Sequence, residues 1–185
     1  MTVYLLVGPT AAGNTTALNH LRQRGLLTVE TSDYVKELLR TYNCKNAYEL
    51  TATLGLEETG RQIALNADEQ LAQAAAQRNT PPSELEGVVG GLRIMRTVQH
   101  FAAHPFYRVE FIGLYASEEL CFKQHRRNGR EQYPTLQAFV EQKLEPDYQL
   151  GLRDIMTRIP QHRRIEVTGD LTHLLASVDG LTCGG

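Results

Sequence analysis

One short segment near the start of the chain has the residue types and spacing of a phosphate-binding loop. Four residues separate Gly8 from Gly13, and Asn14, Thr15 and Thr16 follow directly. Glycines let backbone N–H groups curl around phosphate oxygens, and a helix that begins there adds partial positive charge. The alternative is a turn of small residues that binds nothing. The predicted phosphate contacts come from Gly8, Ala11, Ala12, Gly13, Asn14, Thr15 and Thr16.

Two positions of this loop decide which chemistry it supports. Thr15 stands where the pattern Gly-x(4)-Gly-Lys-Ser/Thr places a hydroxyl that ligates Mg²⁺. Asn14 stands where the pattern places a lysine, which bridges the terminal phosphates and neutralises charge in the transition state. An asparagine amide donates hydrogen bonds but carries no charge. The sequence therefore predicts phosphate binding and leaves catalysis open.

The elements that must position this loop alternate between strands and helices. Residues 3–7 form a continuous β-prone apolar run, typical of a strand buried on both faces. Further strands are expected over residues 26–29, 87–89, 109–115 and 164–167. Helices are expected before Gly25, after Thr31–Asp33, and over residues 46–79, 94–103, 117–125, 135–144 and 170–178, with Ser117 and Asp170 as caps. The pattern predicts an α/β fold with a parallel sheet and helices on both faces.

The composition limits the architecture and the partners. The 185 residues suffice for one α/β domain with a small insert, but not for two domains of ordinary size. The net charge of −2 argues against a dedicated nucleic-acid coat, and no apolar run is long enough to cross a membrane. The first residues lack a basic leader. The three scattered cysteines suit a reducing compartment, so a cytoplasmic location is expected.

Several segments, taken in order, resemble a known family. The loop is followed by Thr31–Asp33, by Val88–Arg93, by the run from Tyr115 to Arg130, and by Val167–Leu171. In this order they resemble the P-loop kinases of the nucleoside-monophosphate-kinase type, closest in layout to dephospho-coenzyme A kinases. The resemblance extends over roughly residues 3–178, and only its first motif is specific by itself.

The resemblance implies a P-loop NTPase fold with a five-stranded parallel sheet and a small helical lid. It implies one domain over residues 1–180, an acceptor-binding helical region at about 43–80, a lid at about 126–145, and a flexible tail over 181–185. It also implies ATP and Mg²⁺ as cofactors and phosphoryl transfer to a hydroxyl or phosphate of a nucleotide-like acceptor. That acceptor is a nucleotide, a nucleoside, a molecule like dephospho-coenzyme A, or a hydroxymethylated base in phage DNA.

The same resemblance suggests roles for individual residues. Asp33 would orient the acceptor and share the metal with Thr15, although a helix cap is the alternative. Arg93 would hold an anionic group of the acceptor, for which its planar guanidinium is suited. The lid would bring in Arg126 and Arg130 to stabilise the transferring group and Arg127 to bind the nucleotide. The alternative for these arginines is an exposed, solvated surface. For a DNA acceptor, phosphate contacts would come from Arg22, Arg24, Arg126, Arg127, Arg130, Arg163 and Arg164.

Two departures from the family pattern affect the chemistry. Asn14 replaces the loop lysine, and Gly90 stands where many relatives have an acidic residue that helps to hold Mg²⁺. Both changes remove charge from the place where phosphates are expected. They motivate a second hypothesis, that the chain is a catalytically impaired or inactive relative that binds a nucleotide or a protein partner.

Overall fold

A five-stranded, all-parallel sheet forms the centre of the computed structural model, which describes residues 1–129 and 132–182. The strands are β1 (Thr2–Val7), β2 (Leu27–Glu30), β3 (Glu86–Gly90), β4 (Arg108–Tyr115) and β5 (Arg164–Glu166). Their spatial order is β2-β3-β1-β4-β5. The predicted parallel sheet is confirmed, and each predicted strand agrees with the observed one to within about one residue at either end.

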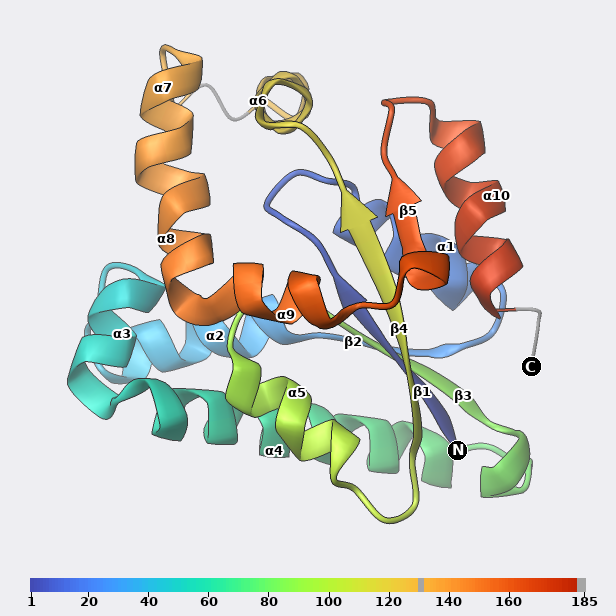
Figure 1. Ribbon diagram of the computed structural model, residues 1–185. Coiled ribbons are helices and arrows are strands. Elements are labelled where there is room, and N and C mark those ends of the chain that lie inside the picture. Colours follow the sequence, from blue (N-terminus) through green and yellow to red (C-terminus); the bar gives the residue numbers. More distant parts are fainter. Residues whose placement is uncertain (130–131, 183–185) are drawn as a thin grey trace.

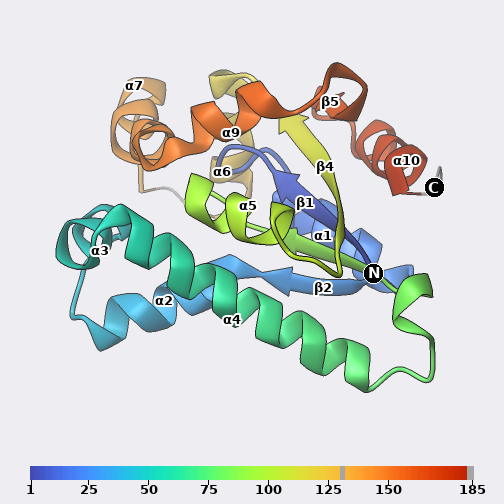
Figure 2. The same ribbon diagram turned by 60° about the horizontal axis from the view of Figure 1, so that its bottom comes forward.

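Helices cover both faces of the sheet (Figures 1 and 2). On one face lie α1 (Asn14–Gln23) and α10 (Leu171–Thr182), and on the other α4 (Leu56–Ala76), α5 (Met95–Ala102) and α9 (Arg153–Arg158). Alternating side chains of β1 supply both cores. Tyr4 and Leu6 pack with α1 and α10, whereas Val3, Leu5 and Val7 pack with the other helices.

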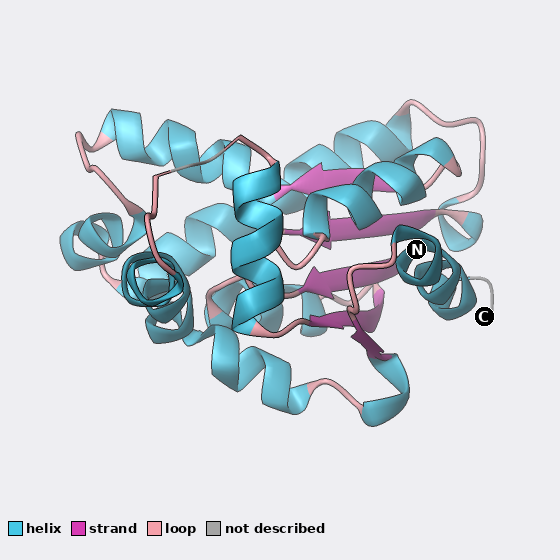
Figure 3. Cartoon of the chain, turned by 90° about the horizontal axis from the view of Figure 1, so that it is seen from above, coloured by secondary structure: helices cyan, strands magenta, loops and turns pink. Residues whose placement is uncertain are grey.

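A second group of helices lies beside and above the sheet (Figure 3). It comprises α2 (Thr31–Thr41), α3 (Ala47–Leu54), α6 (Glu118–Arg127), α7 (Leu136–Phe139), the π-helical turn η2 (Val140–Leu144), α8 (Glu145–Asp147) and a second π-helical turn η3 (Tyr148–Leu152). The short 3₁₀ turns η1 (Pro82–Glu84) and η4 (Gln161–Arg163) precede β3 and β5. A small apolar cluster that includes Leu38, Leu50 and Ile63 joins α2, α3 and α4. Within the described ranges, no helix combines the length and apolar character that crossing a membrane requires.

The helix caps agree with the sequence at two positions and differ at one. Ser117 accepts a hydrogen bond from the Leu120 N–H, and Asp170 accepts one from the Thr172 N–H, as predicted for caps. The predicted cap at Thr31–Asp33 is wrong, because α2 already begins at Thr31 and Asp33 lies inside its first turn.

The helical segment from Glu145 to Arg158 was not predicted, because it contains two residues that usually interrupt helices. Pro146 lies inside a run of helical backbone that begins before α8, because Leu144 and Glu145 are themselves helical, so its missing N–H removes one hydrogen bond to the preceding turn. Gly151 interrupts the helical geometry with a φ of 114°. The predicted tail over 181–185 is also partly wrong, since α10 extends to Thr182, and residues 183–185 lie outside the described part.

Candidate active site

The loop from Gly8 to Thr15 joins β1 to α1 as predicted. Ala11 and Gly13 have positive φ values of 66° and 102°, the kind of backbone turn by which an anion-binding nest gathers N–H groups. A non-glycine residue rarely adopts this conformation. The positive φ of Ala11 therefore indicates a strained backbone of the kind that is found at ligand-binding sites. Gly13 directly precedes α1, which places the positive end of that helix dipole at the loop.

The Asn14 side chain folds back into the loop. Its Nδ2 donates hydrogen bonds to the carbonyl oxygens of Gly8, at 3.1 Å, and Pro9, at 2.9 Å. Its Oδ1 is buried and has no hydrogen-bond partner within the described residues. Asn14 thus braces the start of the loop against its end, and it adds no charge there. Of the other predicted contact residues, Ala12 is buried and Thr16 is exposed in the first turn of α1.

A carboxylate that was not predicted contacts the loop hydroxyl. Thr15 Oγ1 donates to Oε1 of Glu30, the last residue of β2, at 3.2 Å. Glu30 pairs in register with Gly90 on the neighbouring strand β3. A Cβ built on Gly90 would face Leu18 and Leu6, both apolar, rather than Thr15. The carboxylate that contacts Thr15 therefore comes from β2, through Glu30, and not from position 90 on β3.

Asp33 lies apart from this contact. Its carboxylate accepts a hydrogen bond from Lys36 Nζ at 2.7 Å, and its side chain is 76% exposed. Within the described residues, no hydrogen bond joins Asp33 to Thr15. The arrangement thus differs from the predicted pairing of these two side chains, and the carboxylate beside Thr15 belongs to Glu30. An acidic residue directly after a predicted strand was the signal in the sequence.

A buried carboxylate connects Arg93 to the phosphate loop. Asp147 of α8 accepts a hydrogen bond from Thr10 Oγ1 at 2.5 Å, and the same oxygen is 3.2 Å from Arg93 Nε. Thr10 belongs to the phosphate loop, so the structure brings Arg93 to the predicted site. Asp147 was missed because 137 positions separate it from Thr10 in the sequence.

The predicted lid arginines lie at the end of α6. Arg126 and Arg127 are exposed, and the Arg126 guanidinium lies 5.8 Å from the centre of the Phe122 ring. Neither forms a hydrogen bond or ion pair with the loop in the described part of the chain, and Arg130 lies outside it. Four of the arginines considered for DNA already bond within the protein, to Thr28, Asp179, Glu110 and the Ile159 carbonyl; they are Arg22, Arg24, Arg163 and Arg164.

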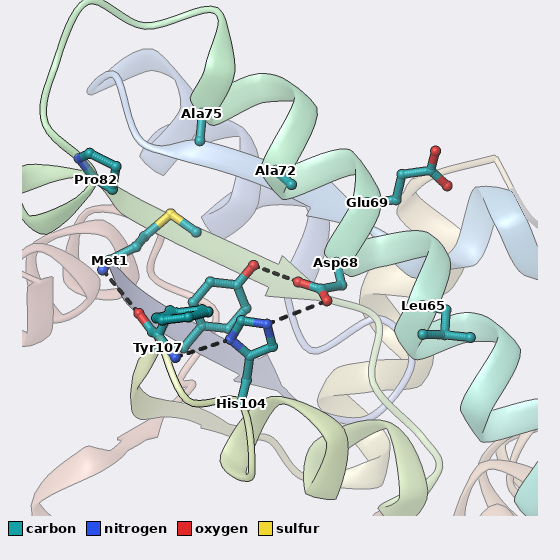
Figure 4. A pocket seen from close by; sticks show the side chains of 10 residues that line it. Met1, Leu65, Asp68, Glu69, Ala72, Ala75, Pro82, His104 and Tyr107 are labelled. Carbon is teal, nitrogen blue, oxygen red and sulfur yellow. Dashed lines mark hydrogen bonds and ion pairs between the residues drawn. The ribbon is translucent and has the colours of Figure 1, made fainter.

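A cavity of about 580 Å³ lies at the opposite, amino edge of the sheet (Figure 4). The cavity is lined by Met1 and Tyr107, which precede β1 and β4, and by Leu65 and Ala72 of α4. Asp68 points into the cavity from α4 toward Tyr107, as the close view shows. No residue of the phosphate loop lines this cavity, so it is separate from the candidate site.

No protein-family model matches the chain, and no curated protein is significantly similar to it in sequence. Solved structures are similar over nearly its whole length. A shikimate kinase from Acinetobacter baumannii in complex with shikimate has a TM-score of 0.54 and 21% identity, covering 95% of this chain and 89% of that one. A sugar kinase from Janibacter sp. HTCC2649 has a TM-score of 0.54 and 12% identity, covering 98% and 94%.

An uncharacterised protein from Eubacterium ventriosum ATCC 27560 also has a TM-score of 0.54, with 11% identity and full coverage of both chains. At these identities the similarity establishes the fold and leaves the activity open. The strand order, the loop after β1 and these neighbours together show that the chain has the P-loop kinase fold.

Proposed function

We propose that the protein is a kinase that transfers the γ-phosphoryl group of ATP to a hydroxyl or phosphate of a small anionic acceptor, in the presence of Mg²⁺. The contact between Thr15 and Glu30 carries this proposal, because it places a hydroxyl and a carboxylate together beside the loop nest. Hydroxyl and carboxylate oxygens are ligands that suit Mg²⁺.

Different residues of the chain would bind the phosphates, hold Mg²⁺ and position the acceptor. The N–H groups of the loop and the positive end of α1 would hold the donor phosphates, with the exception of the Ala12 N–H, which donates to the Pro9 carbonyl. Thr15 and Glu30 would hold Mg²⁺, which neutralises phosphate charge when bound. Arg93 would fix the anionic group of the acceptor beside the loop, since Asp147 holds its guanidinium there.

Two parts of the predicted mechanism stay proposals. Asp33 would orient the acceptor hydroxyl after leaving Lys36, with which it is paired at the surface. Arg126, Arg127 and Arg130 would close over the nucleotide and exclude water. Single alanine variants of these arginines that keep full transfer would remove the lid from the mechanism.

The test is a transfer assay with labelled ATP and a panel of acceptors. The panel comprises nucleosides, nucleotides, dephospho-coenzyme A, hydroxymethylated DNA, shikimate and simple sugars. The Glu30→Gln variant should lower transfer about 100-fold and raise the Mg²⁺ concentration needed for half-maximal rate, because a neutral amide ligates Mg²⁺ poorly. Glu37→Gln, an exposed change on α2, is the matched control and should match the parent.

Three outcomes separate the alternatives. Equal rates for Glu30→Gln and the parent would exclude Glu30 from the site. Transfer to DNA that falls steeply with salt would favour a nucleic-acid acceptor over a small one. If the parent binds ATP but transfers to no acceptor, the second candidate is favoured, a nucleotide-binding protein without transfer. The bonds by which Asn14 closes the loop on itself are the observation that supports this candidate.

A further inference from the structure

A buried carboxylate beside the phosphate loop gathers two cationic side chains. Asp147 has a side chain that is only 9% exposed. One of its oxygens contacts Thr10 Oγ1 and Arg93 Nε, and the other lies 3.9 Å from Lys143 Nζ. Because Thr10 is part of the loop, this one carboxylate places both cations near the loop.

The charges of this cluster do not cancel. Arg93 and Lys143 carry two positive charges and Asp147 carries one negative charge, so these three groups together have a net charge of +1. That is the charge that a lysine at position 14 would have supplied and that Asn14 does not. Since Asp147 is buried, the surrounding protein screens these charges less than water would.

The two cations differ in how firmly they are held. Arg93 is 19% exposed, lies 3.2 Å from Asp147 and donates to the Leu92 carbonyl, so it is fixed by two groups. Lys143 is 40% exposed, and its ammonium is 3.9 Å from Asp147, at the limit of an ion pair. A lysine also has a long flexible stem, which lets its ammonium move by several ångströms. Lys143 is therefore the cation that is free to reach a phosphate.

The helix that carries Lys143 supports this assignment. Lys143 belongs to the π-helical turn η2, and Asp147 lies four residues later on the same face. Such turns are rare and occur often at functional sites, because they shift the residues that follow relative to a regular helix. Here the turn lies between the helical segment that starts at α7 and the carboxylate that contacts the loop.

We propose that Lys143 supplies the positive charge that Asn14 lacks, by contacting the β- and γ-phosphates of the bound nucleotide. This inference rests on the proposed kinase function. In the transfer step an acceptor oxygen bonds to the γ-phosphorus, while the bond from that phosphorus to the bridging oxygen breaks. ADP leaves with the electron pair, and the acceptor proton passes to solvent. Lys143 keeps its proton throughout and neutralises charge on the phosphates.

The test is a double-mutant cycle between positions 143 and 14. Lys143→Gln should lower transfer about 100-fold, the order expected when one charge-stabilising donor is lost. Lys143→Arg should restore part of the rate. In the Asn14→Lys background, Lys143→Gln should cost only a few-fold, because the new lysine supplies the same charge. Lys123→Gln, an exposed change on α6, is the control and should match the parent.

A binding measurement tests the contact without any acceptor. Lys143→Gln should weaken the binding of ATP at least 10-fold and leave the binding of AMP unchanged, because AMP has no β- or γ-phosphate. An unfolding curve that matches the parent would show that the variant is folded. If the parent binds no nucleotide, the proposed function fails, and this inference fails with it.

Two results would overturn the inference and leave the kinase function standing. The first is a parent that transfers phosphate and a Lys143→Gln variant that does so at the same rate. The second is a loss caused by Lys143→Gln that is equally large with Asn14 and with a lysine at that position, since the two side chains would then not share one charge.

Discussion

At each end of the parallel strands, here called the amino edge and the carboxyl edge of the sheet, one carboxylate contacts several hydrogen-bond donors. The two sets of donors differ in their charge and in their contacts with one another. At the amino edge, Asp68 accepts a hydrogen bond from Tyr107 Oη at 2.5 Å and lies 3.3 Å from His100 Nε2 and 3.7 Å from His104 Nε2. The His104 and Tyr107 rings stack with their centres 3.8 Å apart. The donors pack on one another as well as on the carboxylate, so this group stabilises the fold.

At the carboxyl edge, by contrast, two of the donors carry the same charge. Arg93 and Lys143 are both cationic and share Asp147, and these three groups together have a net charge of +1 close to the loop. An excess of positive charge next to a helix N-terminus lowers the free energy of unfolding unless an anion compensates it. Under the proposed function we expect the cluster at the carboxyl edge, and not the one at the amino edge, to bind an anionic ligand.

The largest expected effect comes from neutralising the carboxylate at this edge. Asp147→Asn should lower transfer by more than about 100-fold, because Arg93 and Lys143 lose the group that holds them at Thr10. It should also lower the free energy of unfolding by about 2 to 3 kcal/mol, since a largely buried guanidinium is left without its counterion. Transfer assays and urea unfolding measure the two losses. Unchanged transfer in a folded variant would contradict the division between the edges.

At the amino edge the corresponding change should act on stability alone. Asp68→Asn should lower the free energy of unfolding by about 1 to 2 kcal/mol, because the amide accepts only part of the hydrogen bonds from Tyr107 and the histidines. ATP binding and transfer should match the parent, because no residue of the loop lines this cavity. A tenfold loss of transfer with unchanged unfolding would show that this edge also serves the reaction.

The sequence predicted the parts of the molecule that depend on neighbouring residues. The apolar run before Gly8, the glycine spacing and the helix that begins at Asn14 lie within one short segment, so they specified β1, the loop and α1 together. The same local patterns placed the other strands, and alternation of strands with helices predicted the parallel sheet.

The parts of the site that were missed depend on long-range contacts. Asp147 meets Thr10 across 137 positions, and no local pattern marks either residue as a partner of the other. Lys143 is an ordinary charged residue of a predicted helix until Asp147 places it beside the loop. Glu30 was overlooked in favour of Asp33, which the resemblance to P-loop kinases suggested, whereas Glu30 gains its position from the register of β2 with β3.

The smallest expected effect comes from Tyr107→Phe, which removes one donor of the amino edge and keeps the ring. Near pH 8 it should lower the free energy of unfolding by about 1 kcal/mol, the net worth of one hydrogen bond. Burial, together with the hydrogen bond to Asp68, raises the pKa of Tyr107 above its ordinary value of 10.0. The folded protein therefore keeps this proton where the unfolded chain loses it, and the contribution declines as the pH rises above about 10.

The difference between Tyr107→Phe and the parent should consequently shrink between about pH 8 and pH 11. Urea unfolding of both proteins at the two pH values measures it, and transfer near pH 8 should be the same for both. A difference that grows with pH would mean that the tyrosinate form is favoured in the folded protein. Asp68 and Tyr107 would then form a charged site, and the distinction between a structural edge and a ligand-binding edge would no longer hold.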